Sequence, residues 1–133
     1  MNILAKASYV RVSPRKLELL VRQVKTLTPT EAVTRLQFTP KSGAESLRKL
    51  IISAMANAKQ QNVATSGLRF AKIEVLPGGS MKRFRAVSRG MAHTYKKRMS
   101  HVNVILTEKK VQTQKEENVQ VQMTNAKSNP KSK

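Results

Sequence analysis

Apolar residues in the first half of the chain recur at helical spacing in three separate segments. The first runs from about Pro14 to Lys25, the second from about Pro29 to Gln37 and the third from about Lys41 to Gln61. Within each, apolar residues follow the i, i+3, i+4, i+7 pattern of one helical face. The expected buried positions are Leu17, Leu20, Val21 and Val24, then Val33 and Leu36, and then Ala44, Leu47, Ile51, Ala54, Met55 and Ala58. The pattern predicts three amphipathic helices.

Three Ser/Thr-Pro pairs predict where these helices begin. They are Ser13-Pro14, Thr28-Pro29 and Thr39-Pro40. Each pair places a capping hydroxyl before a proline at the first helical position, where the missing N–H costs no hydrogen bond. Glu31 follows Thr28 by three residues and completes a capping box. Pro40 also disfavours helical backbone at Thr39, which should end the second helix.

From Leu68 onward the apolar spacing changes from helical to alternating, which is typical of a β-strand. Leu68 and Phe70 share one face of this strand. Ile73 and Val75 share a face but are out of phase with the first pair. A β-bulge inserts one extra residue and shifts the alternation in this way. We therefore expect a bulge near residues 71–72.

A second alternating segment supplies a partner for this strand. Val102, Val104 and Leu106 alternate cleanly and predict an antiparallel neighbour. The segment around Ala7 and Tyr9 is also expected to be extended. Together these elements predict an α+β fold, in which three helices pack on a small antiparallel sheet that carries a long, protruding, basic β-hairpin.

The segment between the two strands predicts a single long hairpin. Pairing Val75 with about Asn103 places the turn at Ser88-Arg89-Gly90. Each arm beyond Gly78 then has about 11 residues and spans roughly 35 Å. A two-stranded ribbon of this kind is marginal in water, and its few apolar residues give it no means of folding back onto the core. Something outside the chain must order it, which is compatible with disorder until binding.

The domain organisation follows from these elements. Residues 1–108 are expected to form one α+β domain, with the hairpin at about 77–101. Residues 109–133 contain six lysines, two glutamates and no aromatic residue. This composition predicts a disordered basic tail.

Composition excludes several classes of protein. The 133 residues include neither cysteine nor aspartate, so a disulfide framework, a Cys-based zinc site, a Ser-His-Asp triad and an Asp-rich calcium loop are all excluded. No apolar run approaches the roughly 20 residues of a membrane span. We expect no secretory signal, because Lys6 interrupts the short apolar start of the sequence. We expect a cytoplasmic protein, with an organelle matrix as the alternative.

The net charge of +19 arises from 26 Lys and Arg against 7 acidic residues, and it is unevenly distributed. No acidic residue occurs from Val75 to Thr107. Seven bases fall in this stretch between Lys82 and Arg98, interleaved with Phe84 and Tyr95. A solvated surface normally mixes charges of both signs, because like charges repel. This pattern favours a polyanionic partner, and nucleic acid is the first choice.

Candidate chemistry is sparse. His93 and His101 lack the third and fourth ligands that a zinc site usually needs. A ribonuclease with His101 as general base is conceivable but has no further support, and a histidine in a basic arm more often contacts a phosphate. We expect no catalytic residue, no metal and no cofactor. A DNA-bending protein with a basic ribbon arm remains an alternative, although the predicted tip lacks the apolar or proline wedge typical of such arms.

Several blocks of residues resemble the universal large-subunit ribosomal protein family L twenty-two, bacterial type, over about residues 4–108. They are Ala5-Lys6-Ala7, Tyr9-Val10-Arg11, Ser13-Pro14-Arg15-Lys16, Phe38-Thr39-Pro40-Lys41 with Ala44-Glu45, Ser53-Ala54-Met55-Ala56-Asn57-Ala58, Ser80-Met81-Lys82-Arg83, Lys97-Arg98 and Ser100-His101. The chain departs from the family at the tip, where Ala86, Val87 and Met91 stand in place of proline and additional arginine.

The resemblance implies a structural constituent of the large ribosomal subunit that binds its rRNA, assists assembly and is not an enzyme. The hairpin would reach the wall of the nascent-peptide exit tunnel. Neighbouring ribosomal proteins and the nascent peptide would be further partners, with no membrane and a single copy in the ribosome. The implied rRNA contacts are Lys6, Arg11, Arg15, Lys16, Lys82, Arg83, Arg85, Lys96, Lys97, Arg98 and His101. The implied tunnel-facing tip is Val87, Ser88, Arg89, Gly90 and Met91.

Overall fold

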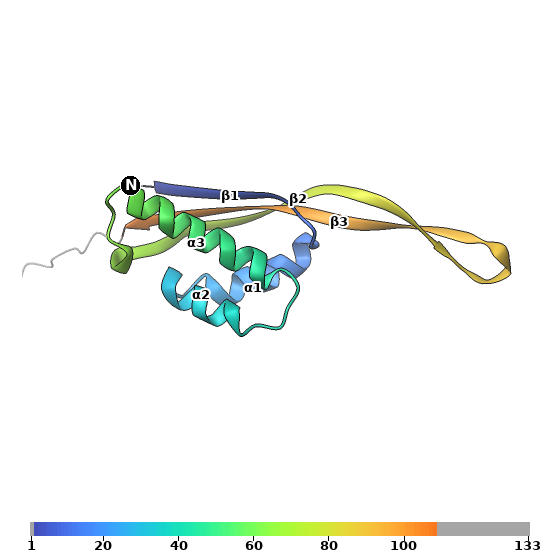
Figure 1. The fold of residues 1–133 in the computed structure, drawn as a ribbon, viewed down its shortest axis with the longest axis horizontal. Helices are drawn as coiled ribbons and strands as arrows, with labels where there is room; N and C mark the ends of the chain where they lie inside the picture. Colours follow the sequence, from blue (N-terminus) through green and yellow to red (C-terminus); the bar gives the residue numbers. More distant parts are fainter. Residues whose placement is uncertain (1, 109–133) are drawn as a thin grey trace, which may run out of the picture.

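The computed structural model describes residues 2–108, which form a three-stranded sheet with three helices and a long hairpin (Figure 1). The elements in chain order are β1 (Asn2–Val10), α1 (Pro14–Val24), α2 (Pro29–Gln37), α3 (Ala44–Gln60), a 3-10 turn η1 (Thr65–Gly67), β2 (Leu68–Ala86), a 3-10 turn η2 (Ser88–Gly90) and β3 (Ala92–Glu108). The predicted α+β fold class is confirmed. The predicted tail at 109–133 lies outside the described residues, so the domain boundary stays a prediction.

Strand β3 lies at the centre of the sheet, in the order β1-β3-β2, and both of its neighbours are antiparallel to it. Its residues Val102, Val104 and Leu106 are buried and alternate along one face, as predicted. Ile3 and Ala5 of β1 are also buried and join the same core. This apolar face of the sheet packs against the stripes of the three helices. The apolar pattern of the sequence did not indicate that β1 pairs with β3.

The predicted helix boundaries are confirmed for α1 and α2. The capping box at α2 is present: the Glu31 amide donates to Thr28 Oγ1 at 3.4 Å, and the Thr28 amide donates to Glu31 Oε2 at 3.0 Å. The hydrogen bond from the Thr28 backbone lowers the pKa of the Glu31 carboxyl. Ser13 also precedes its helix, but its side chain makes no capping hydrogen bond.

The predicted start of the third helix at Lys41 is wrong, because α3 begins at Ala44. The Thr39 hydroxyl donates to the Arg35 carbonyl at 2.8 Å, so this side chain closes α2 instead of capping α3. Gly43 precedes α3 with φ 97°, a left-handed conformation that favours glycine. A Cβ at Gly43 would lie only 2.9 Å from Leu17 Cδ2, so the close packing of α1 against this position also requires a residue without a side chain.

Most predicted core positions on the helices are buried, with two exceptions. Val33 and Met55 are only half-buried and pack against the edge of the core. Ala32 and Leu50, which were not predicted, are buried. Glu45 pairs with Lys49 at 3.7 Å on the exposed side of α3, and Arg48 makes a shorter contact with Glu45 at 2.9 Å. No helix in the described part of the chain is long and apolar enough to cross a membrane.

The pairing of β2 with β3 follows the predicted hairpin closely. The expected bulge is present between Phe70 and Lys72. Val75 pairs with Val102 and not with Asn103, so the predicted register is wrong by one residue. A second register shift between Pro77 and Ser80 compensates, which keeps the turn at the predicted residues 88–90.

Candidate nucleic-acid interface

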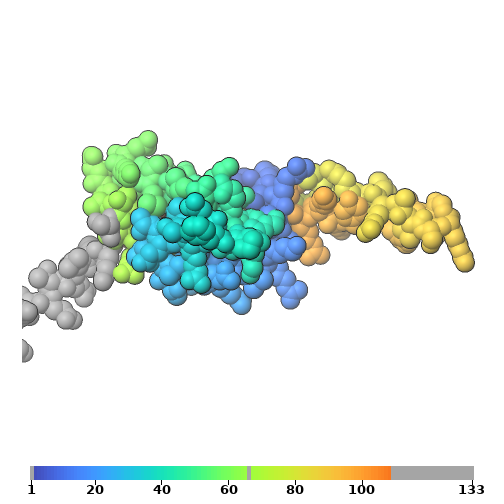
Figure 2. All heavy atoms as spheres, turned by 60° about the horizontal axis from the view of Figure 1, so that its bottom comes forward, coloured from blue at the N-terminus to red at the C-terminus, as the bar shows by residue number. Residues whose placement is uncertain are grey.

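The outer part of the hairpin extends beyond the helices and touches none of them (Figures 1 and 2). Its strands pair continuously from Ser80 opposite Arg98 to Ala86 opposite Ala92. Every residue from Lys82 to Arg98 is exposed. The prediction that this ribbon does not fold back onto the core is confirmed. The body therefore contributes no contact that would stabilise the ribbon.

The register divides the basic residues between the two faces of the ribbon. Residues directly opposite each other share a face, and successive residues alternate between faces. One face carries the pairs Met81 with Lys97, Arg83 with Tyr95 and Arg85 with His93. The other face carries Ser80 with Arg98, Lys82 with Lys96 and Phe84 with Thr94. Each face thus has three Lys or Arg side chains and one Phe or Tyr ring.

The pair of Lys82 and Lys96 is unfavourable for the isolated protein. Like charges directly opposite one another destabilise a sheet. No acidic residue occurs between Val75 and Thr107 to relieve this repulsion. The Arg83 guanidinium turns back along its own strand, where Nη1 donates to the Lys82 carbonyl at 2.8 Å. The ribbon is therefore arranged so that an external anion would stabilise it.

Three of the five glutamates in residues 2–108, Glu31, Glu45 and Glu74, are already engaged within the body. Lys72 Nζ lies 2.6 Å from Glu74 Oε1, and this hydrogen bond, with a second from Asn103, lowers the pKa of Glu74. The hydrogen bond from Arg48 lowers the pKa of Glu45 in the same way. All the ion pairs in residues 2–108 lie outside the segment from Lys82 to Arg98. The positive charge of the hairpin is not neutralised from within the described chain.

Three of the predicted body contacts lie near the root of the hairpin. Val10 at the end of β1 pairs with Ser100, so Arg11 follows directly beside the root. Arg15 and Lys16 are in the first turn of α1, which begins after this segment, and all three side chains are exposed. Lys6 pairs with Asn103 farther along the sheet and alternates with the buried Ala5, so it faces away from the helices.

His101 lies in a cluster at the root that the sequence did not reveal. The Tyr9 amide donates to His101 Nδ1 at 3.2 Å, and the two rings meet edge to face with centroids 4.7 Å apart. Tyr9 has φ 56°, a conformation that is uncommon without glycine, at the irregularity in β1. A Cβ at Gly78 would lie 3.1 Å from His101 Nε2, so glycine permits the ring to approach β2.

A buried serine adds a second connection at the same place. Ser100 is 0% exposed, and its hydroxyl donates to the Val12 carbonyl at 2.8 Å. The root is therefore joined to the segment before α1 through both Ser100 and His101. This arrangement fixes where the hairpin leaves the body. A contact of His101 with rRNA stays a prediction, and Nδ1 is already occupied.

The two histidines lie at different levels of the hairpin. His93 pairs with Arg85 on the outer arm, whereas His101 pairs with Leu76 at the root. In residues 2–108 no three His, Cys, Asp or Glu side chains gather where they could hold a metal ion.

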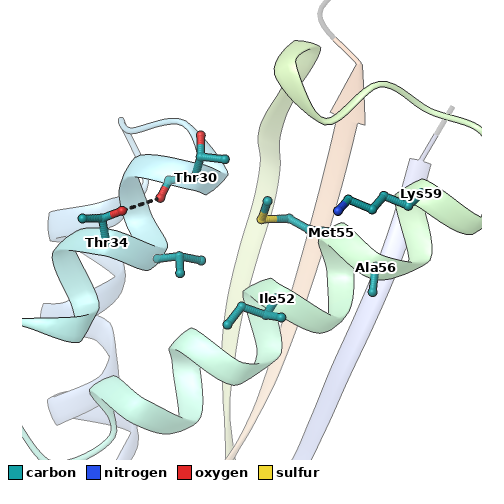
Figure 3. A pocket seen from close by; sticks show the side chains of 7 residues that line it. Thr30, Thr34, Ile52, Met55, Ala56 and Lys59 are labelled. Carbon is teal, nitrogen blue, oxygen red and sulfur yellow. Dashed lines mark hydrogen bonds between the residues drawn. The ribbon is translucent and has the colours of Figure 1, made fainter.

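The body has a separate hollow between α2 and α3, with a volume of about 320 Å³ (Figure 3). Its lining is Thr30, Val33, Thr34, Ile52, Met55, Ala56 and Lys59. The Thr34 hydroxyl donates to the Thr30 carbonyl at 3.2 Å. Lys59 is the one titratable side chain in this lining, so the hollow holds no acid–base pair.

Comparison with known proteins identifies the family. A sequence model described as ribosomal protein L22p/L17e matches residues 5–107. The chain belongs to the ribosomal protein L22p/L17e family. The large ribosomal subunit protein uL22 of Clostridioides difficile is 40% identical over 111 residues, covering 83% of this chain and 100% of the relative. The uL22 protein of Desulfosudis oleivorans is 37% identical over 108 residues, covering 81% of this chain and 95% of the relative.

Family membership confirms the main functional predictions. As a member of this family, the protein is a structural constituent of the large ribosomal subunit in the cytoplasmic ribosome. Its partners are ribosomal RNA and ribosomal proteins. It is not an enzyme, because its family is structural. Because the chain belongs to this family, the alternative hypotheses of a ribonuclease and of a DNA-bending protein are set aside.

Proposed function

We propose that the hairpin binds large-subunit rRNA through both of its faces. The observation that carries this proposal is the placement of Lys82 opposite Lys96 in a ribbon without any acidic residue. Phosphates on both sides would remove the repulsion and release bound counterions, which favours association. The residues assigned to these contacts are Lys82, Arg83, Arg85, Lys96, Lys97 and Arg98.

The body supplies a second group of rRNA contacts beside the root. Arg11, Arg15 and Lys16 are exposed where the chain passes from β1 into α1. Together with the hairpin they would contact RNA on both the body and the arm, next to the root. Lys6, on the far face of the sheet, and the Nε2 edge of His101 are further candidates. Binding at several separate positions would bring segments of rRNA together and so assist subunit assembly.

The tip is assigned to the wall of the nascent-peptide exit tunnel. It consists of Val87, Ser88, Arg89, Gly90 and Met91, all exposed, with Arg89 at φ 60° and Gly90 at φ 68°. The Val87 amide donates to the Met91 carbonyl at 2.8 Å and closes the loop. This end of the protein lies farthest from the helices (Figure 1). A single copy per ribosome would place the tip beside the nascent peptide.

Shortening the tip tests the division between rRNA-binding arm and tunnel-facing loop. Replacing residues 86–92 with Asn-Gly keeps Arg85 opposite His93, because this dipeptide suits a two-residue hairpin turn. We expect a near-normal yield of large subunits, since all six assigned bases of the arm remain. Nascent-chain pausing and sensitivity to tunnel-binding antibiotics should change. The measurement pairs a subunit profile with drug inhibition of translation by the same ribosomes.

Each readout of the shortened variant bears on a different part of the proposal. Normal subunits with unchanged pausing and drug response would show that this tip does not line the tunnel. A loss of large subunits would show that tip residues are needed for rRNA docking. A control is the Phe38→Leu variant, which changes an exposed side chain of the body, keeps the hairpin intact and should leave both readouts unchanged.

A further inference from the structure

A hollow of about 550 Å³ lies on the outer arm of the hairpin, away from the core. Its lining is Phe84, Arg85, Val87, His93, Thr94 and Tyr95. Arg85 is directly opposite His93, and Tyr95 is two residues from His93 on β3, so these three share one face of the ribbon. Val87 beside the turn completes the lining, together with Phe84 and Thr94, which the register assigns to the other face of the ribbon.

The apolar surface in this hollow is not used by the protein itself. Tyr95 is 43% exposed and Val87 is 44% exposed. The body of the protein does not reach this far along the arm (Figure 2). Tyr95 is one of only five Phe and Tyr residues in the chain. A partner that covers Tyr95 and Val87 would remove apolar area from water, which favours binding.

The charge around the hollow selects the chemistry of that partner. Arg85 lies in the lining, and Arg83 and Lys97 lie on the same face toward the root. No acidic residue is present between Val75 and Thr107. The carboxylates of an acidic peptide could match the charge, but the Asp and Glu side chains that carry them have no flat ring to stack on Tyr95. Duplex RNA offers phosphates, but its base faces are already stacked on one another. An unpaired nucleotide offers both a phosphate and an exposed base face.

We infer that this hollow binds one unpaired base of rRNA, stacked on Tyr95, with Arg85 on an adjacent phosphate. Aromatic rings and guanidinium planes are the usual platforms for unstacked RNA bases. The inference rests on the proposed rRNA contacts of the hairpin and adds to them a position where a base is held as well as its phosphate. Charge alone would place the RNA without fixing which nucleotide lies at Tyr95.

Binding of the full chain to two single-stranded oligomers tests the inference. One is octauridylate, and the other is an abasic ribose-phosphate oligomer of the same length, which carries the same phosphates without bases. We expect octauridylate to bind about 5- to 150-fold more tightly, from the stacking of one base. Tyr95→Leu should abolish this preference without changing affinity for the abasic oligomer, and Tyr95→Phe should retain it. Phe38→Leu, which removes an exposed ring from the body, is the matched control and should leave the preference unchanged.

Tyrosine emission gives a direct readout of stacking, because the chain has two tyrosines and no tryptophan. Octauridylate should quench the emission of the unaltered chain, whereas Tyr95→Phe, which leaves only Tyr9, should show little quenching. Equal affinity for the two oligomers, with strong salt dependence, would overturn the stacking site but leave the rRNA contacts standing. Failure to bind either oligomer would contradict both. An equal loss on both oligomers in Tyr95→Leu, or equally tight binding of octaglutamate, would also overturn the assignment.

Discussion

Replacing Lys82, Arg83 and Arg85 together with glutamine should flatten the salt dependence of RNA binding by about two to three units in the log–log slope. The unaltered chain should show a slope of roughly −4 to −6 if its six or seven hairpin bases meet phosphates. At 0.1 M salt the difference corresponds to a loss of roughly 100- to 1000-fold in affinity. The measurement is a titration of large-subunit rRNA at several salt concentrations.

A matched variant separates the hairpin from overall charge. Lys25, Lys49 and Lys59 are exposed on the body, and their replacement with glutamine removes the same net charge. We expect this control to change the slope by less than about one unit, because these side chains lie away from the ribbon. Equal effects in the two triple variants would mean that overall charge, and not the hairpin, controls binding. A slope near zero in the unaltered chain would contradict the assignment of a polyanionic partner.

Leu20→Ala and Ile51→Ala should each lower the free energy of unfolding by roughly 2–5 kcal/mol, the usual cost of the cavity left by a buried side chain. Both residues are 0% exposed in the core shared by helices and sheet. The chain offers a neighbour of the same type for each as a control. Leu19 and Ile52 are 52% and 41% exposed, and Leu19→Ala and Ile52→Ala should cost less than about 1 kcal/mol. Urea denaturation of the full chain measures all four.

This comparison tests how the helices are oriented on the sheet. If Leu19→Ala destabilised the protein as much as Leu20→Ala, the buried face of α1 would be assigned wrongly. Because the outer arm of the hairpin extends beyond the helices (Figure 1), RNA binding by each variant below its unfolding transition should match that of the unaltered chain.

The sequence predicts those parts of the fold that depend on local pattern. The capping box at Thr28 and the apolar stripe of α1 are complete within a few residues, so helix position follows directly from them. The start of α3 was predicted wrongly because Thr39 can either cap α3 or close α2. Only the close approach of Leu17 to Gly43 decides between these two roles. That approach joins distant segments and has no local signature.

The candidate site likewise has parts that the sequence predicts and parts that depend on contacts between distant segments. The acid-free hairpin and its turn follow from charge and alternation along the chain. The division of the basic residues between two faces depends on the register of β2 against β3. That register shifts between Pro77 and Ser80, at the glycines 78 and 79. The cluster of Tyr9, Gly78 and His101 joins three distant segments, and the left-handed backbone of Tyr9 has no sequence signal.

Sedimentation of a cell lysate through a sucrose gradient tests most directly whether the hairpin holds this protein in the large ribosomal subunit. The tagged full chain should travel with the large subunit, and so should the variant with Lys25, Lys49 and Lys59 replaced. The variant with Lys82, Arg83 and Arg85 replaced should shift toward the top of the gradient as free protein, because it loses phosphate contacts on both faces of the ribbon. Full chain that remains at the top, or that travels with the small subunit, would contradict the assignment. Undiminished sedimentation of the hairpin variant would show that the body, and not the arm, holds the protein in place.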